Sequence, residues 1–247
     1  MDHYGSAMPA ITELVTNRHG VRVFQRHWEA VGEPRAAMLI VHGIAEHSGR
    51  YDHVATHFAD AGVDVLSYDQ RGHGETHGTR GHVGSFRELL DDVEAFLEQR
   101  RALGLPVILL GHSLGGLVCA SYAVSSRPQP DLLVLSAPAL AANIPGWQKT
   151  LAPVLSKITP KLMMPSDFDG ELLSRDPEVG ERYRTDPLRL RKVSARFGAE
   201  IFDAMERTTE RRKRITVPTY VLHGQADRLV PPSASAPLED VPLVTRT

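Results

Sequence analysis

Apolar runs and helical patterns alternate along the first half of the chain. Four continuous apolar runs have the length of strands buried on both faces, and they occupy residues 36–43, 63–69, 106–111 and 131–138. Segments with helical spacing separate these runs, at residues 51–61, 85–104 and 114–126. The earlier residues 20–28 alternate apolar and polar positions, as a half-exposed strand does. Strands separated by helices predict a doubly wound, mainly parallel α/β sheet with its active loops at the carboxyl ends of the strands.

The alternation stops near Ala139 and resumes at Val217. Residues 139–215 contain no clean buried strand, and prolines separate short amphipathic segments such as WQKTLAPVLSKI. A buried strand, VPTYVLHG, follows at residues 217–224. We therefore expect a helical cap insertion at about 139–215, on the side of the active loops, within a single domain that spans residues 1–247.

The composition of the chain indicates which kind of partner it binds and where in the cell it occurs. The 247 residues are enough for one core, and 28 basic against 30 acidic residues leave a net charge of −2. We expect a neutral small-molecule substrate and no nucleic acid, because the basic run at residues 206–214 has no interleaved aromatic residues. Cys119 is the single cysteine, and the start of the chain lacks a signal-peptide pattern. With no apolar stretch of about 18 residues, we expect a soluble, cytoplasmic protein.

A glycine-framed serine is the strongest chemical signal. The stretch VILLGHSLGGLV, residues 107–118, places Ser113 between Gly111 and Gly115. The run before it predicts a strand and the residues after it predict a helix, which is the context of a nucleophile elbow. A side chain at either glycine would crowd the turn, and the helix dipole would favour negative charge at the serine. The pattern predicts that Ser113 is a catalytic nucleophile.

Two backbone amides are candidates for an oxyanion hole. One is the amide of Leu114, directly after the nucleophile, and the other is that of Ile44, which follows His42 and Gly43 at the end of a buried strand. We interpret His42 as orienting this backbone. His47, with Glu46 and Arg50, is interpreted as part of a polar network that holds the loop, rather than as a base.

No metal site is expected. Three histidines, His73, His77 and His82, occur in one glycine-rich loop, but they lack the helical spacing that would bring them together around an ion.

The candidate acid comes late in the chain. The stretch VLHGQADRLVPP, residues 221–232, places Asp227 just after a buried strand, in a turn that ends with two prolines. A nucleophile followed by an acid, with the histidine last, is the chain order of α/β-hydrolases.

Four motifs together resemble one family. HGIAEHSGRY, DQRGHGETHGTRGH, LLGHSLGG and VLHGQADRLVPP, in this order, resemble the monoacylglycerol lipase, or serine aminopeptidase-like, branch of the α/β-hydrolases. The resemblance covers about residues 20–240; Thr76 stands where the family often has serine, and Leu114 where it often has methionine. It implies hydrolysis of a monoacylglycerol, a mobile lid over an apolar tunnel and no cofactor. It also implies Ser113 as nucleophile, Asp227 as acid, and Ile44 and Leu114 as the oxyanion hole.

The family's catalytic histidine has no counterpart in the sequence. In the family it follows one more helix and strand after the acid, whereas none of the 20 residues after Asp227 is histidine. We expect the C-terminal strand and helix to be missing, with SASAPLEDVP as a helix and LVTRT as the start of the last strand. Four other histidines are weaker alternatives for the base: His42, His47, His112 and His223. The chain is then either a fragment, which the family pattern up to Thr247 favours, or a natural truncation.

The missing base changes the expected activity. Because the members of a triad act as a unit, the 247 residues alone are expected to retain trace esterase activity at most. Two alternatives stay open: another esterase or lysophospholipase on the same fold, and a non-catalytic lipid-binding protein. An apolar cap favours a lipid substrate and permits transient membrane contact; the residues that indicate it are Leu151, Val154, Leu155, Ile158, Leu162, Met163 and Met164.

Overall fold

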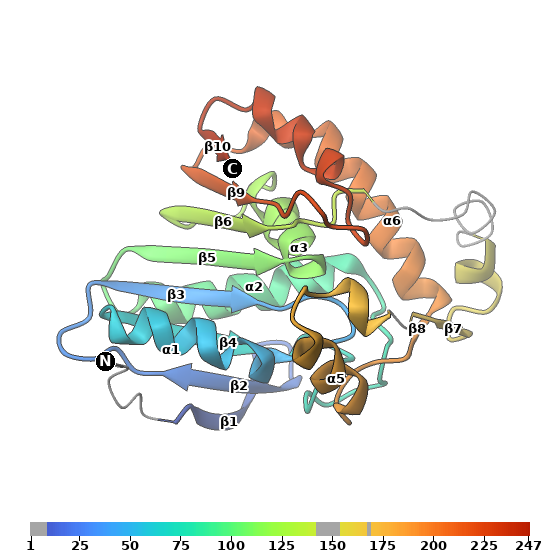
Figure 1. Cartoon of the computed structure of the whole chain (residues 1–247), viewed down its shortest axis with the longest axis horizontal. Helices are drawn as coiled ribbons and strands as arrows, with labels where there is room; N and C mark the ends of the chain where they lie inside the picture. The colour runs from blue at the N-terminus through green and yellow to red at the C-terminus, as the bar shows by residue number, and fades with distance from the viewer. Residues whose placement is uncertain (1–8, 142–153, 167–168) are drawn as a thin grey trace.

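One eight-stranded sheet forms the centre of the molecule (Figure 1). The computed structural model describes residues 9–141, 154–166 and 169–247. The strands are ordered β1-β2-β4-β3-β5-β6-β9-β10; the first two pairings are antiparallel and the others parallel. Their bounds are β1 Ile11–Thr16, β2 Arg22–Trp28, β3 Ala36–Val41, β4 Val63–Tyr68, β5 Val107–His112, β6 Leu132–Ser136, β9 Thr219–Leu222 and β10 Val244–Arg246. The mainly parallel, doubly wound sheet expected from the sequence is confirmed.

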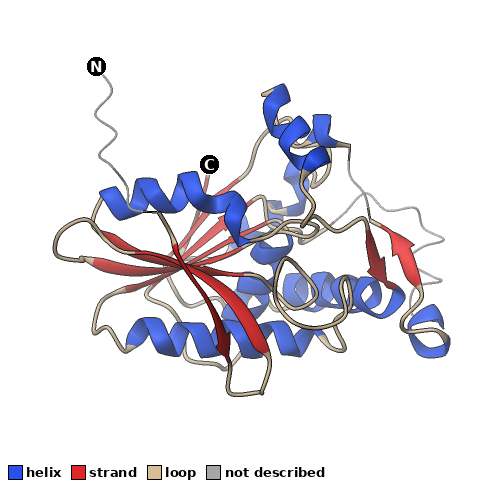
Figure 2. Ribbon diagram, turned by 90° about the horizontal axis from the view of Figure 1, so that it is seen from below, coloured by secondary structure: helices blue, strands red, loops and turns tan. Residues whose placement is uncertain are grey.

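Helices cover both faces of this sheet (Figure 2). Helix α1, Asp52–Asp60, packs on one face, while α2, Phe86–Arg101, and α3, Leu114–Ala123, pack on the other with α6, Ala195–Glu210. In β3, Leu39 and Val41 belong to the larger core, and Met38 and Ile40 belong to the core beside α1. Successive residues of a strand point to opposite faces, so a strand covered on both faces reads as one continuous apolar run.

Strand β1 had no signal in the apolar pattern. Five of its six residues are exposed, and it pairs with β2 alone at the edge of the sheet. An edge strand that is almost wholly exposed has no need for an apolar run or for alternation, so neither was there to detect.

The cap combines helices with a short ribbon. Residues 154–158 are helical, and α5 spans Pro177–Thr185. Between them, β7, Met163–Pro165, pairs antiparallel with β8, Lys192–Ser194, which the expectation of a purely helical insertion did not include. Three residues are too short to show a period of two. Figure 1 shows this ribbon at the right-hand end of the molecule, beyond the carboxyl ends of the parallel strands.

The last residues follow the expectation in part. The segment expected to be a helix forms two 3₁₀ turns, Pro232–Ala234 and Ala236–Asp240. LVTRT does begin the last strand, as expected: β10, Val244–Arg246, lies within it and pairs parallel with β9, so this strand is not missing from the sheet. Tyr220 and Leu222 of β9 are half exposed. Among the described residues, no helix is both long and apolar enough to cross a membrane.

Candidate active site

Ser113 lies at a sharp turn between β5 and α3. Its backbone has φ +52° and ψ −115°, a strained conformation for a residue with a side chain. The backbone is held on both sides, because the Ser113 amide donates to Ser136 O at 3.0 Å and the Ala139 amide donates to Ser113 O at 3.0 Å. The turn therefore presents the serine at the carboxyl end of β5 and at the start of a helix.

The glycines around Ser113 are required by close backbone contacts. A Cβ atom on Gly111 would lie 2.3 Å from Gly115 O, and one on Gly115 would lie 2.0 Å from Val41 O. A Cβ atom on Gly116 would lie 2.8 Å from the Cα atom of Pro138. Steric exclusion thus accounts for all three glycines of the motif.

The loop after β3 runs beside Ser113. A Cβ atom on Gly43 would lie 3.2 Å from the Cβ atom of Ser113. Ile44, Ser113 and Leu114 all line one cavity of about 930 Å³ between the sheet loops and the cap. Leu114 is the first residue of α3, so its N–H has no acceptor inside the helix. The two amides named as oxyanion donors are thus brought to the same cavity as the serine.

His42 controls the peptide unit that carries the Ile44 amide. The Gln70 amide donates to His42 Nε2 at 2.9 Å, so the ring hydrogen is on Nδ1, which donates to Gly43 O at 2.7 Å. Burial is the largest influence on the pKa of His42 and lowers it, which keeps the ring neutral. Because Gly43 C=O and Ile44 N–H belong to one rigid peptide unit, the bond to the carbonyl fixes the direction of the N–H.

Glu46 fixes the preceding peptide unit. Its Oε1 accepts from the Gly43 amide at 2.5 Å and from the Tyr51 hydroxyl at 2.7 Å, and its Oε2 is 3.3 Å from Arg50 Nε. His47 contacts a different region: its Nε2 is 2.9 Å from Asp186 Oδ2, in the cap. The polar network expected around this loop thus extends into the cap.

Asp227 lies at the same cavity, after β9. Its Oδ1 accepts from the amides of Leu229 and Val230, both at 2.9 Å. Its Oδ2 is 3.8 Å from His223 Nε2. The turn therefore orients the carboxylate through one oxygen and leaves the other oxygen able to accept a stronger hydrogen bond.

The alternative histidines all have other partners. His223 is 1% exposed; its Nδ1 is 2.7 Å from Ser235 Oγ, and its Nε2 is 2.9 Å from Val230 O. His42 and His47 hold the loop after β3 through both of their ring nitrogens. His112 does line the cavity, but its Nδ1 lies 3.1 Å from the Ser136 carbonyl oxygen. Within the described residues, no cluster of three metal-ligating side chains occurs.

The apolar wall of the cavity differs from the expected one. Of the apolar cap residues named from the sequence, only Met164 lines the cavity, and Leu151 lies outside the described residues. The wall instead comes from the turn before α5, from α5 and from α6, with Leu172, Leu173, Val179, Ile201, Phe202 and Met205. Within β7, Met164 lines the cavity, whereas its neighbour Met163, which points to the opposite side of the strand, does not. Ile201 and Phe202 stand four and three residues before Met205, which is the spacing of one helix face. This spacing was the signal in the sequence for the α6 part of the wall.

Charged residues at the cavity balance one another. The lining includes three arginines and three carboxylates: Arg50, Arg175, Arg228, Glu46, Glu171 and Asp227. The lining thus has no excess of either sign.

Comparisons with known proteins agree on one family. The model of the serine aminopeptidase S33 family matches residues 32–241. A monoacylglycerol lipase of Mycolicibacterium smegmatis is 34% identical over 226 residues, which cover 90% of this chain and 80% of the relative. Phospholipase YtpA of Bacillus subtilis is 34% identical over 208 residues, or 82% of this chain and 80% of the relative. The crystal structure of Paleococcus ferrophilus monoacylglycerol lipase superposes with a TM-score of 0.84 at 36% identity, covering 92% of this chain and 88% of that one.

Proposed function

We propose that this chain, which belongs to the serine aminopeptidase S33 family of α/β-hydrolases, is a serine hydrolase of carboxylic esters with monoacylglycerol as its substrate. One observation carries the proposal. Ser113 with Leu114, Ile44 and Asp227 come from three separate parts of the sequence and line one cavity. The names of the relatives, monoacylglycerol lipases among them, support the substrate.

The proposed reaction follows from the placement of these groups. The Ser113 hydroxyl gives its proton to a base, and its oxygen attacks the ester carbonyl. The amides of Ile44 and Leu114 donate to the resulting oxyanion, and the amino end of α3 adds its dipole. The carbon–oxygen bond to glycerol then breaks, glycerol takes the proton, and an acyl-serine is left. Water hydrolyses this ester and releases the fatty acid.

The base in this proposal is a histidine oriented by the Oδ2 atom of Asp227. The histidines nearest the site are bound to other partners within the described residues, which supports a histidine supplied from outside residues 1–247. Residues 1–247 alone then retain only the catalysis that an oxyanion hole and binding provide, roughly 10³ to 10⁴ over water.

The cavity favours a single neutral lipid chain. Leu172, Ile201, Phe202 and Met205 provide an apolar wall for the acyl group. The equal numbers of positive and negative side chains at the lining give no field that would favour an anionic headgroup. An uncharged glycerol ester with one acyl chain fits both the apolar wall and the balanced charges of the lining.

A second candidate is a lysophospholipase. Arg175 and Arg228 line the cavity and form no ion pair with another described residue, so they offer two cations to a phosphate. The resemblance to a bacterial phospholipase favours this candidate too. A non-catalytic lipid-binding protein is the third candidate.

The test uses the full product of the gene. We expect faster hydrolysis of monoacylglycerols than of lysophosphatidylcholine, lysophosphatidic acid or aminoacyl anilides, and loss of all hydrolysis in Ser113→Ala. A preference for the lysophospholipids, lost in the double variant Arg175→Ala and Arg228→Ala, supports the second candidate and overturns the first. Lipid binding without any hydrolysis supports the third.

A further inference from the structure

Gly43 combines close contact with conformational freedom. A Cβ atom at this position would lie 2.7 Å from Glu46 Oε1 and 3.2 Å from the Cβ atom of Ser113, so a side chain there would displace Glu46 and crowd Ser113. Glycine, however, restricts its own backbone less than any other residue does. Because Ile44 follows directly, the direction of its N–H depends on what holds the two peptide units around Gly43.

Gln70 holds the peptide unit before Gly43. The side-chain Nε2 of Gln70 donates to His42 O at 2.6 Å. That carbonyl belongs to the same peptide unit as the Gly43 N–H, which donates to Glu46 Oε1 at 2.5 Å. The unit is therefore bound on both sides, by Gln70 at its oxygen and by Glu46 at its nitrogen.

Gln70 also holds the peptide unit after Gly43, through the ring of His42. The Gln70 backbone amide donates to His42 Nε2 at 2.9 Å, which leaves the ring hydrogen on Nδ1, and Nδ1 donates to Gly43 O at 2.7 Å. The Gly43 carbonyl and the Ile44 N–H belong to one peptide unit. One residue thus reaches both of the peptide units that flank Gly43.

The residue before Gln70 holds the other end of the same loop. Asp69 Oδ1 accepts from the Ser48 amide at 2.8 Å and from the Ser48 hydroxyl at 2.6 Å. Strands β3 and β4 are parallel neighbours, so the loops that follow them leave the sheet side by side. Two consecutive residues after β4 therefore fix both ends of the segment 42–48.

The amide of Gln70 is kept at a cost to stability. Gln70 is 0% exposed, and its Oε1 has no hydrogen-bond partner among the described residues. A buried acceptor without a donor is unfavourable, and an apolar side chain of the same length would avoid it. Polar groups that are retained against such a cost are typical of functional sites. The contribution of this amide is the hydrogen bond from its Nε2 to His42 O.

We propose that Gln70 is a positioning residue for the oxyanion hole, which fixes the direction of the Ile44 amide without contacting the substrate. Gln70 is not among the residues that line the cavity, whereas Ile44 is. The inference rests on the proposed function, because the amide has an oxyanion to stabilise only if the chain cleaves esters. Since the oxyanion forms only in the transition state, a misdirected amide lowers kcat and leaves KM nearly unchanged.

Gln70→Met tests this role in the full gene product. Methionine has a similar length, lacks the donor N–H and removes the unpaired oxygen. For hydrolysis of a soluble short-chain ester, we expect kcat to fall by about tenfold or more, with KM within about threefold of the parent. Gln70→Asn, whose amide is one methylene shorter, should give the same result and decides the question if Gln70→Met does not fold.

Hydrogen exchange measures the position of the loop without any need for activity. Mass spectrometry of the same proteins reports exchange of the amides at residues 42–46. Loss of the bond to His42 O frees the peptide unit that carries the Gly43 N–H, so we expect exchange there to become faster by about fivefold or more.

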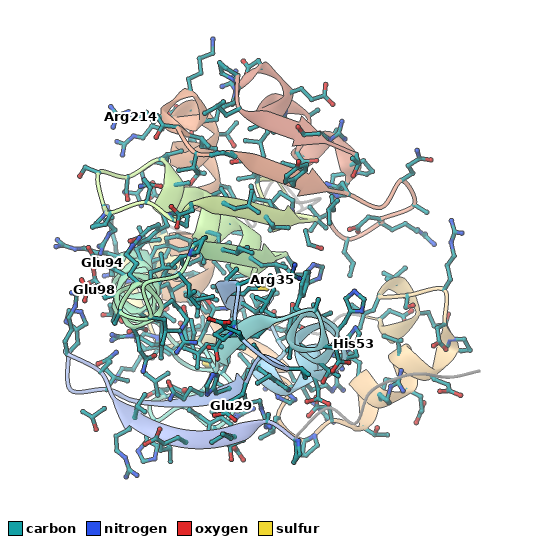
Figure 3. All side chains as sticks on the ribbon, turned by 90° about the vertical axis from the view of Figure 1, so that its left-hand side faces the viewer. Glu29, Arg35, His53, Glu94, Glu98 and Arg214 are labelled. Atoms are coloured by element: carbon teal, nitrogen blue, oxygen red, sulfur yellow. The ribbon has the colours of Figure 1, made fainter. Side chains whose placement is uncertain are left out.

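Gln129→Met is the matched control. The Gln129 amide also donates to a main-chain carbonyl, Arg127 O at 2.8 Å, and its Oε1 is also buried without a partner among the described residues. Gln129 precedes β6, at the amino ends of the parallel strands. Figure 3 views the molecule from this end and labels Glu94, which forms an ion pair with Arg127. Both kcat and exchange at residues 42–46 should stay within about twofold of the parent.

Three kinetic outcomes would overturn the inference: equal losses of kcat in Gln70→Met and Gln129→Met, an unchanged kcat in both Gln70 variants, or a rise in KM alone. Faster exchange without a fall in kcat would overturn it too, because the loop would then move without any effect on the reaction. If the parent hydrolyses no ester, the proposed function fails, and exchange at residues 42–46 alone decides whether Gln70 positions the loop.

Discussion

The Nε2 atom of His47 lies 2.9 Å from the Oδ2 atom of Asp186, a contact between residues 139 positions apart in the chain. It connects the loop that carries the Ile44 amide to the cap. Two further contacts run in parallel: the Leu190 amide donates to Ala45 O at 3.4 Å, and the Arg50 guanidinium lies 5.5 Å from the centre of the Tyr183 ring. The loop after β3 is thus held by the sheet on one side and by the cap on the other.

Asp186→Asn should loosen this loop without unfolding the protein. Both side chains of the pair are little exposed, so their coupling should be about 1 kcal/mol. We expect faster amide hydrogen exchange at residues 44–50 and a small fall in Tm. His47→Gln in the Asp186→Asn background should add little to either effect. Additive effects of the two substitutions would show that the pair is not coupled.

His42→Phe should damage the proposed oxyanion hole. The phenyl ring cannot donate to Gly43 O, so the Gly43–Ile44 peptide unit loses the bond that orients its N–H. In the full gene product, we expect kcat to fall by about 10- to 100-fold with KM nearly unchanged, since the interaction strengthens only in the transition state. His42→Asn retains a donor near the Nδ1 position and should recover part of the loss. An equal loss in both variants would indicate a packing role instead.

Residues 1–247 alone should label poorly at Ser113. Without a base, the serine hydroxyl is a weak nucleophile, so a fluorophosphonate probe should give no burst of labelling above that of Ser113→Ala. Mass spectrometry of the intact protein measures this directly. Rapid labelling that Ser113→Ala abolishes would mean that a histidine among these residues acts as the base, and His112, which lines the cavity, would be the first to test by substitution.

Gly115→Ala should be far more destabilising than Gly104→Ala. The added methyl group at position 115 would lie 2.0 Å from Val41 O, a buried backbone atom that cannot move without breaking β3. We expect a loss of about 3 kcal/mol or more in the free energy of unfolding, measured in urea. Gly104 has φ +70° and open space around it, so alanine there should cost about 1 to 2 kcal/mol. Similar costs at the two positions would contradict the close contact.

Acid should destabilise the fold partly through His73. Burial is the largest influence on its pKa and lowers it from 6.5 to about 3. At pH values between these two pKa values, the unfolded chain binds a proton at His73 that the folded chain does not bind. The contribution of His73 to the free energy of unfolding is therefore fully present above about pH 6.5 and is lost as the pH decreases. At pH 4.5 the loss from this group is about 2 to 3 kcal/mol.

His73→Asn should reduce this acid sensitivity. Asparagine does not titrate, and its amide can still donate toward Arg71 O, which lies 3.0 Å from His73 Nδ1. Urea unfolding at pH 7 and at pH 4.5 measures the difference in stability between the two conditions. His77→Asn, at an exposed position, is the control and should leave that difference unchanged. An unchanged difference in His73→Asn as well would show that other groups dominate the acid response.

Local sequence patterns were sufficient to predict much of the fold and to identify the candidate site residues. The continuous run of β3 predicted a strand covered on both faces, because neighbouring residues of a buried strand face opposite cores. The strand, glycine and helix context of Ser113 predicted the sharp turn, because only a residue without a Cβ atom fits at position 111, against the backbone of Gly115 four residues later. These features depend on neighbours in the chain, and a single sequence records them.

The cavity wall and the outer surface of the cap required the tertiary structure. Val154, Ile158, Leu162 and Met163 have the composition of a wall, yet they are exposed, and Ile201, Phe202 and Met205 of α6 contribute to the wall instead. Which face of a short strand or helix turns inward depends on how distant segments pair, and three residues of β7 contain too little pattern to show it. The sequence by itself thus determined the buried parallel strands of the sheet, the sharp turn at Ser113 and the order of the candidate groups. Only the tertiary structure decided what surrounds the substrate and what faces outward, because those contacts join residues far apart in the chain.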